Sequence, residues 1–195
     1  VTMHEADLGN KILRPSGTMM LAAFLPECMG LVYVNLSNNQ LATKEAGRAL
    51  AEALAASTVL QELDVSGNGN DWFKGIDRHG FAVELAAGLK KNESLQLLNI
   101  SKNDLGEPAF PDVHAGDGAI AIVNAIKEHS ALMSFVCNQN KLASTEFGHA
   151  CSQLLTASDT LEELDVSSNA WTEMVMQGVK PRTTTKQHRL FSSPQ

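Results

Sequence analysis

A nine-residue pattern, LxxLxLxxN, occurs five times in this chain and constrains its fold more than any other feature. Its apolar positions are filled by Leu, Val, Ile, Phe or Cys. The copies begin at Leu31, Leu60, Leu95, Leu132 and Leu161. Their asparagines, at positions 39, 68, 103, 140 and 169, are 29, 35, 37 and 29 residues apart, which gives a period of 29 with insertions of 6 and 8. Regular self-similarity at this period predicts stacked repeats, each too small to bury its apolar face alone.

A sixth unit is predicted at the N-terminus. Asn10, 29 residues before Asn39, is interpreted as its asparagine. This register puts Glu5 and Asp7 at positions that are apolar in the other units.

Apolar pairs with helical spacing precede every copy of the pattern. They lie ten and six residues before the strand-opening leucine, at Leu21 and Leu25, Leu50 and Leu54, Leu85 and Leu89, Ile122 and Ile126, and Cys151 and Leu155. Residues four apart share one face of a helix, whereas the following Leu-x-Leu alternates as a strand does. Because the distance from helix to strand is constant, both insertions are predicted in strand-to-helix loops, at residues 69–80 and 104–117.

Stacking such units would build one continuous core. The strands would form a parallel sheet on the concave side and the helices would cover the convex side. The recurring asparagine is expected to satisfy buried backbone groups where the chain turns out of each strand. Gly47 and Gly148, each eight residues after its asparagine, are expected where one helix approaches the neighbouring unit closely.

The repeats resemble leucine-rich repeats of the ribonuclease-inhibitor-like subtype, which also occurs in NOD-like receptors and Ran GTPase-activating proteins. The resemblance covers residues 8–171. It implies an α/β fold: a right-handed leucine-rich-repeat solenoid, or horseshoe arc, of five to six units over residues 1–173. Residues 174–195 are predicted to form a flexible basic tail. For function, the resemblance implies a protein-binding module that contacts its partner through the concave sheet and adjoining loops, and not an enzyme.

The outward positions of the predicted strands are the first candidate contact surface. None of the fifteen positions is Lys or Arg, and two acidic pairs, Glu62 with Asp64 and Glu163 with Asp165, suit a basic partner. The alternative is that these positions are polar only because they face solvent. The candidate contact residues are Tyr33, Asn35, Glu62, Asp64, Asn99, Glu163 and Asp165.

The two enlarged loops are the second candidate surface. They belong to adjacent units and should emerge side by side. They carry Trp72, Phe73 and Phe110, although only 5% of the chain is aromatic. Exposed aromatic residues on anchored loops are typical of contact hot spots. The alternative is that they pack on their own units to hold the loops in place.

Charge and composition narrow the class of partner. Residues 1–173 carry a net charge of −11, and Lys180, Arg182, Lys186 and Arg189 follow them without any acid. An acidic body repels phosphate backbones, so nucleic acid is not expected as a partner. A membrane is not expected because no stretch of about 18 or more apolar residues occurs. No small-molecule substrate or cofactor is expected because no catalytic or phosphate-binding motif occurs. Three cysteines without framework spacing favour an intracellular, cytoplasmic setting.

Chemical sites are weakly supported by the sequence. His79, His114 and the aspartates of the enlarged loops have the right types for metal ligands but no motif spacing, so no metal site is predicted. Cys137 and Cys151 stand at core positions and are interpreted as small buried hydrophobes. Two alternatives to partner binding remain open: regulation of a GTPase or similar switch protein, and a structural spacer within a larger receptor-like protein.

Overall fold

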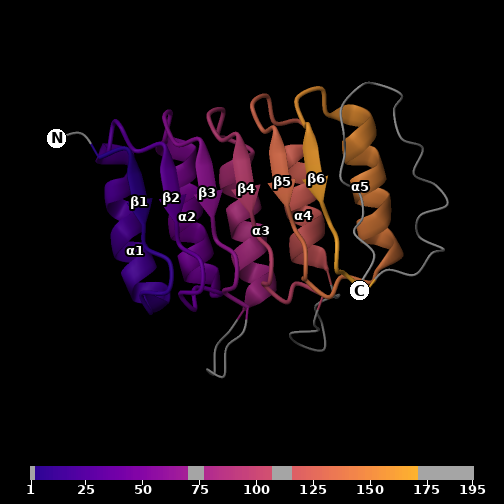
Figure 1. The fold of residues 1–195 in the computed structure, drawn as a ribbon, viewed down its shortest axis with the longest axis horizontal. Coiled ribbons are helices and arrows are strands. Elements are labelled where there is room, and N and C mark those ends of the chain that lie inside the picture. Colours follow the sequence, from indigo (N-terminus) through magenta and orange to yellow (C-terminus); the bar gives the residue numbers. More distant parts are fainter. Residues whose placement is uncertain (1–2, 70–76, 107–115, 171–195) are drawn as a thin grey trace.

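The computed structural model describes residues 3–69, 77–106 and 116–170 (Figure 1). Strands and helices alternate along the chain. The strands are β1 (Glu5–Asp7), β2 (Tyr33–Asn35), β3 (Glu62–Asp64), β4 (Leu97–Asn99), β5 (Ser134–Val136) and β6 (Glu163–Asp165). The helices are α1 (Arg14–Phe24), α2 (Lys44–Ala56), α3 (Arg78–Leu89), α4 (Asp117–Ile126) and α5 (Thr145–Ala157), with a short 3-10 helix η1 (Leu25–Glu27) after α1.

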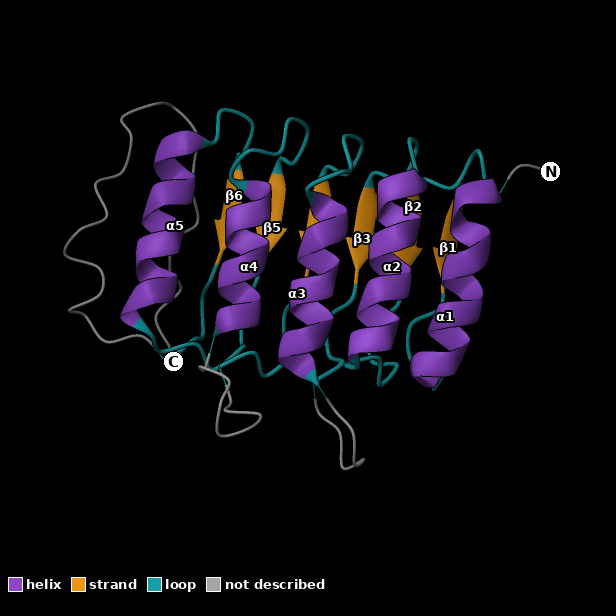
Figure 2. Cartoon of the chain, turned by 180° about the vertical axis from the view of Figure 1, so that it is seen from behind, coloured by secondary structure: helices purple, strands orange, loops and turns teal. Residues whose placement is uncertain are grey.

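The strands form one parallel sheet whose spatial order, β1 to β6, is the order of the sequence. The strands are in register, so that Tyr33, Glu62 and Leu97 are successive neighbours across β2, β3 and β4. All five helices lie on one side of this sheet, and each packs on the next helix in the chain (Figure 2). No described helix lies on the other face of the sheet, which we call the open face (Figures 1 and 2).

The core lies between the sheet and the helices. The central residue of every strand is buried, from Ala6 in β1 to Leu164 in β6. The predicted apolar helix pairs are fully buried in α2, α3 and α4. In α5 the buried partner of Cys151 is Leu154, whereas the predicted Leu155 is only partly buried. The position of Leu154 is also buried in α2, α3 and α4, so α5 keeps this part of the core-facing stripe and differs only at Leu155.

The predicted register of the first unit is wrong by one residue. Glu5 and Asp7 pair with Tyr33 and Asn35, so Ala6 faces the core in their place. Lys11 takes the asparagine position of this unit. Its backbone N–H donates to the side-chain oxygen of Asn39, just as the backbone N–H of Asn39 donates to the side-chain oxygen of Asn68. Asn10 precedes that position and has a positive φ of 57°, similar to that of Asn38.

The recurring asparagines form a ladder between units, which confirms their predicted role. The Asn68 side-chain oxygen accepts the Asn39 backbone N–H at 2.7 Å, and its amide donates to the carbonyls of Leu36 in the preceding unit and Val65 in its own. The same pattern links Asn103 to Asn68, Asn140 to Asn103 and Asn169 to Asn140. Each turn is therefore closed by a side chain from the unit that follows it.

Both insertions lie between a strand and the next helix, as predicted. The segment from β3 to the start of α3 at Arg78, and that from β4 to the start of α4 at Asp117, are the two enlarged connections. A Cβ atom added at Gly47 would lie 2.5 Å from the Phe81 carbonyl oxygen, which confirms the close approach predicted there. Within the described ranges, no helix has both the length and the apolar character that crossing a bilayer requires.

Candidate functional site

The open face of the sheet presents its side chains in two rows, because the strands are in register. One row follows the first strand residues and the other follows the third. The first row is Glu5, Tyr33, Glu62, Leu97, Ser134 and Glu163, and the second is Asp7, Asn35, Asp64, Asn99, Val136 and Asp165. Seven of the ten predicted contact residues thus lie together on this face. Trp72, Phe73 and Phe110 lie outside the described residues.

Most residues of the second row bind their own backbone. The side-chain oxygens of Asn35, Asp64 and Asn99 accept the N–H two residues later, at 2.8–3.0 Å. Asp165 does the same with Ser167 at 2.9 Å. Such Asx turns fix the chain as it leaves the strand. These side chains consequently have a structural role that the sequence reading did not assign to them.

Amide groups separate the carboxylates along the face. Asn35 donates to Asp7 at 2.8 Å, and Asn99 donates to Asp64 at 3.1 Å. On β6, Asp165 accepts from Asn138 at 2.7 Å. Alternation of Asp and Asn puts a donor beside each of these carboxylates, where a second carboxylate would be repelled.

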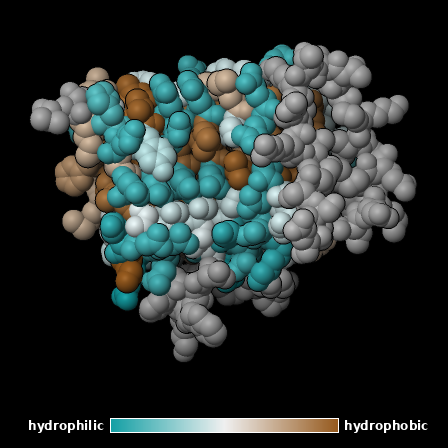
Figure 3. All heavy atoms as spheres, viewed as in Figure 1, coloured by the Kyte–Doolittle hydropathy of each residue, from teal (hydrophilic) through white to brown (hydrophobic). Residues whose placement is uncertain are grey.

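Carboxylates surround Tyr33 in the N-terminal half of the face. The pKa of the Tyr33 hydroxyl is raised, first by burial and then by four carboxylates, Asp64, Asp7, Glu62 and Glu5. None of the residues in the six strands is Lys or Arg. In the part of this face that grey atoms leave visible in Figure 3, hydrophilic side chains predominate, with some hydrophobic ones between them. The face therefore favours cationic ligands.

Glu5 and Asp7 were missed by the sequence reading because of the shifted register. The signal was present, since Met3, Ala6 and Leu8 repeat the spacing of Leu31, Val34 and Leu36.

Two of the predicted outward positions are buried. Ser37 and Ser101 are only 7% and 4% exposed, whereas Ser66 and Ser167 are partly exposed. The turn of the preceding unit donates a backbone N–H to each of these serine carbonyls, from Asn10 to Ser37 and from Gly67 to Ser101, and it does the same for Ser66 and Ser167. Ser37 and Ser101 therefore belong to the stacked turns and not to the open surface.

The described ends of the enlarged loops lie at one edge of the sheet, where the parallel strands end. Gly69 packs on the backbone of Asn103 so closely that a Cβ atom would overlap it, and Gly106 packs in the same way on Lys141. Arg78 holds the two ends of the first loop together by donating to the Gly69 carbonyl at 2.9 Å. Both loops thus start from rigid, adjacent turns.

Residues considered as metal ligands or nucleophiles have structural surroundings. Asp77 accepts the Gly80 N–H at 2.7 Å as the N-cap of α3, and His79 is buried in that helix. Burial strongly raises the pKa of the Cys137 thiol and raises that of Cys151 to about 12, so both thiols stay protonated. In the part of the chain that the structure describes, no three His, Cys, Asp or Glu side chains are grouped to hold a metal ion.

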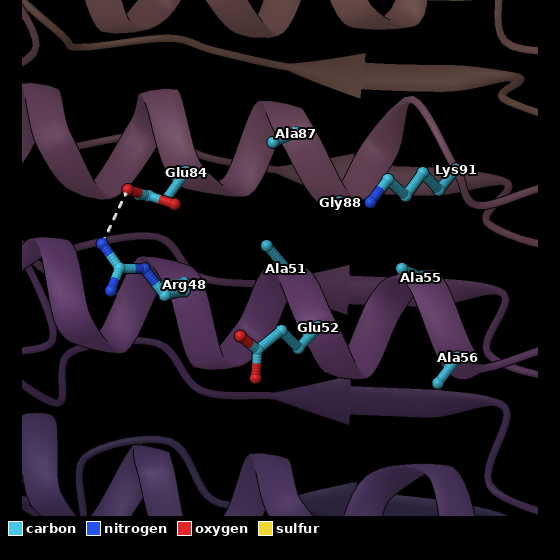
Figure 4. A pocket seen from close by; sticks show the side chains of 9 residues that line it. All are labelled: Arg48, Ala51, Glu52, Ala55, Ala56, Glu84, Ala87, Gly88 and Lys91. Carbon is cyan, nitrogen blue, oxygen red and sulfur yellow. Dashed lines mark hydrogen bonds and ion pairs between the residues drawn. The ribbon is translucent and has the colours of Figure 1, made fainter.

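A shallow groove of about 420 Å³ runs between α2 and α3 on the helical side (Figure 4). Its floor consists of small residues, including Ala51 and Gly88, because a Cβ atom on Gly88 would lie 2.5 Å from the Ala51 backbone. At one end Arg48 donates to Glu84 at 3.3 Å. The groove follows from tight helix packing. Its lining includes two cations, Arg48 and Lys91, and two carboxylates, Glu52 and Glu84, so its net charge is zero.

The N-terminal end of the molecule exposes apolar side chains. Phe24 and Met20 of α1 are 63% and 69% exposed. The position of Phe24 is buried in all four later helices, where it is filled by Ala53, Gly88, Ala125 and Leu154. Gly88 packs on Ala51 of the preceding helix, whereas no described helix precedes α1.

Comparison with known proteins identifies the fold alone. No protein-family model matches the chain, and no curated protein matches it. A solved structure described as "Leiomodin-1 Actin-Binding Site 2 (ABS2)" is similar, with a TM-score of 0.54 and 20% sequence identity. The match covers 74% of this chain and 76% of that chain. The chain therefore shares an α/β architecture of parallel strands and alternating helices with a structure named for an actin-binding site.

Proposed function

We propose that this chain is a leucine-rich-repeat module of the ribonuclease-inhibitor-like kind, and that it binds a basic surface of another protein through the open face of its sheet. The family and its right-handed solenoid form are supported by the periodic sequence, by the asparagine ladder and by the position of both insertions. Stacked repeats expose an extended, rigid face that suits protein partners.

The charge of the open face carries the proposal. Six carboxylates stand on β1, β3 and β6, and no strand residue is cationic. A complementary charge on a partner accelerates encounter and fixes its orientation. On the two central strands, Leu97 and Val136 are half-buried; Leu97 has Glu62 as its neighbour on β3, and Val136 has Asp165 as its neighbour on β6. An apolar centre with a charged rim is the usual arrangement of protein interfaces.

The similar solved structure supports a protein-binding use of this architecture. Its description names an actin-binding site. At 20% identity this likeness does not extend to the identity of the partner.

A face variant tests the proposal. It carries Glu62→Gln, Asp64→Asn, Glu163→Gln and Asp165→Asn, which remove four charges and keep the oxygens that form the Asx turns. A matched control carries Glu45→Gln, Glu52→Gln, Glu128→Gln and Glu146→Gln, at exposed positions on the helical side. Proteins captured from cell extract by the wild-type chain are identified by mass spectrometry and purified, and their dissociation constants are then measured.

The proposal expects a partner whose affinity falls at least ten-fold in the face variant and stays unchanged in the control. Its binding should also weaken as salt screens the charges. Equal affinity for both variants would refute binding through the acidic face.

The enlarged loops are proposed as a second contact region of the same interface. A further variant, Trp72→Ala, Phe73→Ala and Phe110→Ala, separates this region from the sheet. Loss of the partner in this variant alone would place the main energy of binding on the loops. A partner list that no variant changes would instead favour the spacer role.

A further inference from the structure

The charges of this chain differ in sign before and after Glu173. Carboxylates dominate the open sheet face, whereas the residues after Glu173 include four cations and no acid. We propose that residues 174–195 are an intramolecular ligand of the open sheet face and contact the carboxylates of β6 and β3. This inference rests on the proposed binding role of that face. In it, the segment competes with the external partner for the face.

The tail segment, residues 174–195, can reach every strand. The described chain ends at Ala170, next to Asn169, which is held at the end of β6 by bonds to Cys137 and Val166. The ten residues from there to Lys180 extend at most about 36 Å. Neighbouring strands are about 4.8 Å apart, so β1 lies roughly 24 Å from β6. The first cation of the tail segment is thus within reach of all six carboxylates.

The chemistry of the tail segment matches the face beyond its net charge. Val179 precedes Lys180, and Leu190 and Phe191 directly follow Arg189. On the sheet, the half-buried Leu97 and Val136 separate the acidic pairs of β3 and β6. Cations flanked by apolar residues in the tail segment can therefore meet carboxylates flanked by apolar residues on the sheet.

Tethering makes a weak contact sufficient. A segment joined by a short linker has an effective concentration of the order of 1 mM. A contact with a dissociation constant of about 1 mM, too weak to matter between separate molecules, would then be formed about half of the time. An external partner would bind about two-fold more weakly than to an unoccupied face, because it must displace the tail segment.

Paramagnetic relaxation in the 195-residue chain tests this contact. A nitroxide is attached through Ser193→Cys in a Cys28→Ser background, in which the remaining cysteines, Cys137 and Cys151, are buried. In about 10 mM salt, amide signals of β6 and β3 are expected to lose at least two-fold in intensity. The loss should disappear in about 1 M salt, where the screening length is only about 3 Å.

Two charge variants make the result specific. Lys180→Gln, Arg182→Gln, Lys186→Gln and Arg189→Gln together should abolish the broadening. The control, Lys11→Gln, Lys90→Gln, Lys91→Gln and Lys102→Gln, removes four exposed cations elsewhere and should preserve it.

Broadening centred on Met20 and Phe24 of α1, or broadening that depends on protein concentration, would overturn the inference in favour of another site or a second copy. Absence of selective broadening at low salt would overturn it outright. This measurement needs no partner, so its result is independent of the capture experiment. A tail contact without any captured partner would refute only the proposed function. A captured partner without a tail contact would refute only this inference.

Discussion

Asn103 provides the sharpest test of how the repeats are held together. Its side-chain oxygen accepts the Asn68 N–H at 2.7 Å, and its amide donates to the carbonyls of Val65 at 3.0 Å and Ile100 at 2.9 Å. The residue is only 4% exposed, so water cannot readily replace it. Asn103→Ala would remove all three bonds. The Val65 and Ile100 carbonyls would keep bonds from the Asn68 and Asn140 side chains, whereas the buried Asn68 N–H would lose its acceptor.

The expected cost follows from these three bonds. Each contributes about 1 kcal/mol, and a buried group left unsatisfied costs a further 1–3 kcal/mol. We expect Asn103→Ala to lower the free energy of unfolding by about 4 kcal/mol, against a total of roughly 5–15 kcal/mol for a domain. Asn99→Ala is the matched control. Asn99 bonds Ser101 and Asp64 at a half-buried position where water can substitute, so its loss should cost about 1 kcal/mol.

Urea unfolding followed by far-ultraviolet circular dichroism measures both values. Asn103→Asp adds a second test. Burial beside two carbonyl oxygens would raise the pKa of the new carboxyl above its unfolded value. This variant should therefore be most stable at low pH and lose stability as the pH rises through the folded pKa. The reasoning fails if Asn103→Ala costs no more than Asn99→Ala, or if Asn103→Asp has the same pH profile as the wild-type chain.

Three further perturbations have defined outcomes. Burial lowers the pKa of His129, whose Nδ1 accepts two backbone N–H groups. Unfolding should therefore take up a proton, so the free energy of unfolding should fall as the pH drops below about 6.5. His129→Asn should reduce that fall in urea titrations between pH 5 and 8. Gly88→Ala would place a Cβ atom 2.5 Å from the backbone of α2 and should lower the free energy of unfolding by about 1–3 kcal/mol. For Gly17→Ala the nearest atom to the new Cβ would be 3.3 Å away, so the free energy of unfolding should change by less than about 1 kcal/mol. Equal thermal unfolding of the two variants would count against tight helix packing. The fully buried Cys137 thiol, with its raised pKa, should react with an alkylating reagent far more slowly than Cys28, and mass spectrometry of the native chain showing equal rates would contradict its burial.

The fold could be predicted from the sequence because the repeats of one chain can be aligned with each other. The strands, the helices and both insertions follow from five copies of one pattern, and the asparagine ladder follows from the need to satisfy buried turns. The first unit was misread because Lys11 stands where the other units have asparagine. That substitution leaves the backbone register intact, since Lys11 still donates its own N–H to Asn39.

The details of the site depend on neighbouring strands and could not be predicted from single repeats. The acidic character of the face was visible in Glu62 and Asp64. The hydrogen bond from Asn99 on the next strand to Asp64 could not be predicted, because it depends on the register between the strands. A second cap was also overlooked: three residues before the strand-opening leucine, Asn92 and His129 accept N–H groups of the turn after the helix.

The direction of the asparagine ladder has a consequence for synthesis on the ribosome. Because each turn is closed by the asparagine of the unit after it, a newly made unit keeps unsatisfied backbone groups until the next 29 or more residues have emerged. At 5–20 residues per second, that interval is about 1.5–6 s per unit. Assembly would then advance from the N-terminus one step behind translation, and a chain that stalls within a unit would carry an open turn at its growing end.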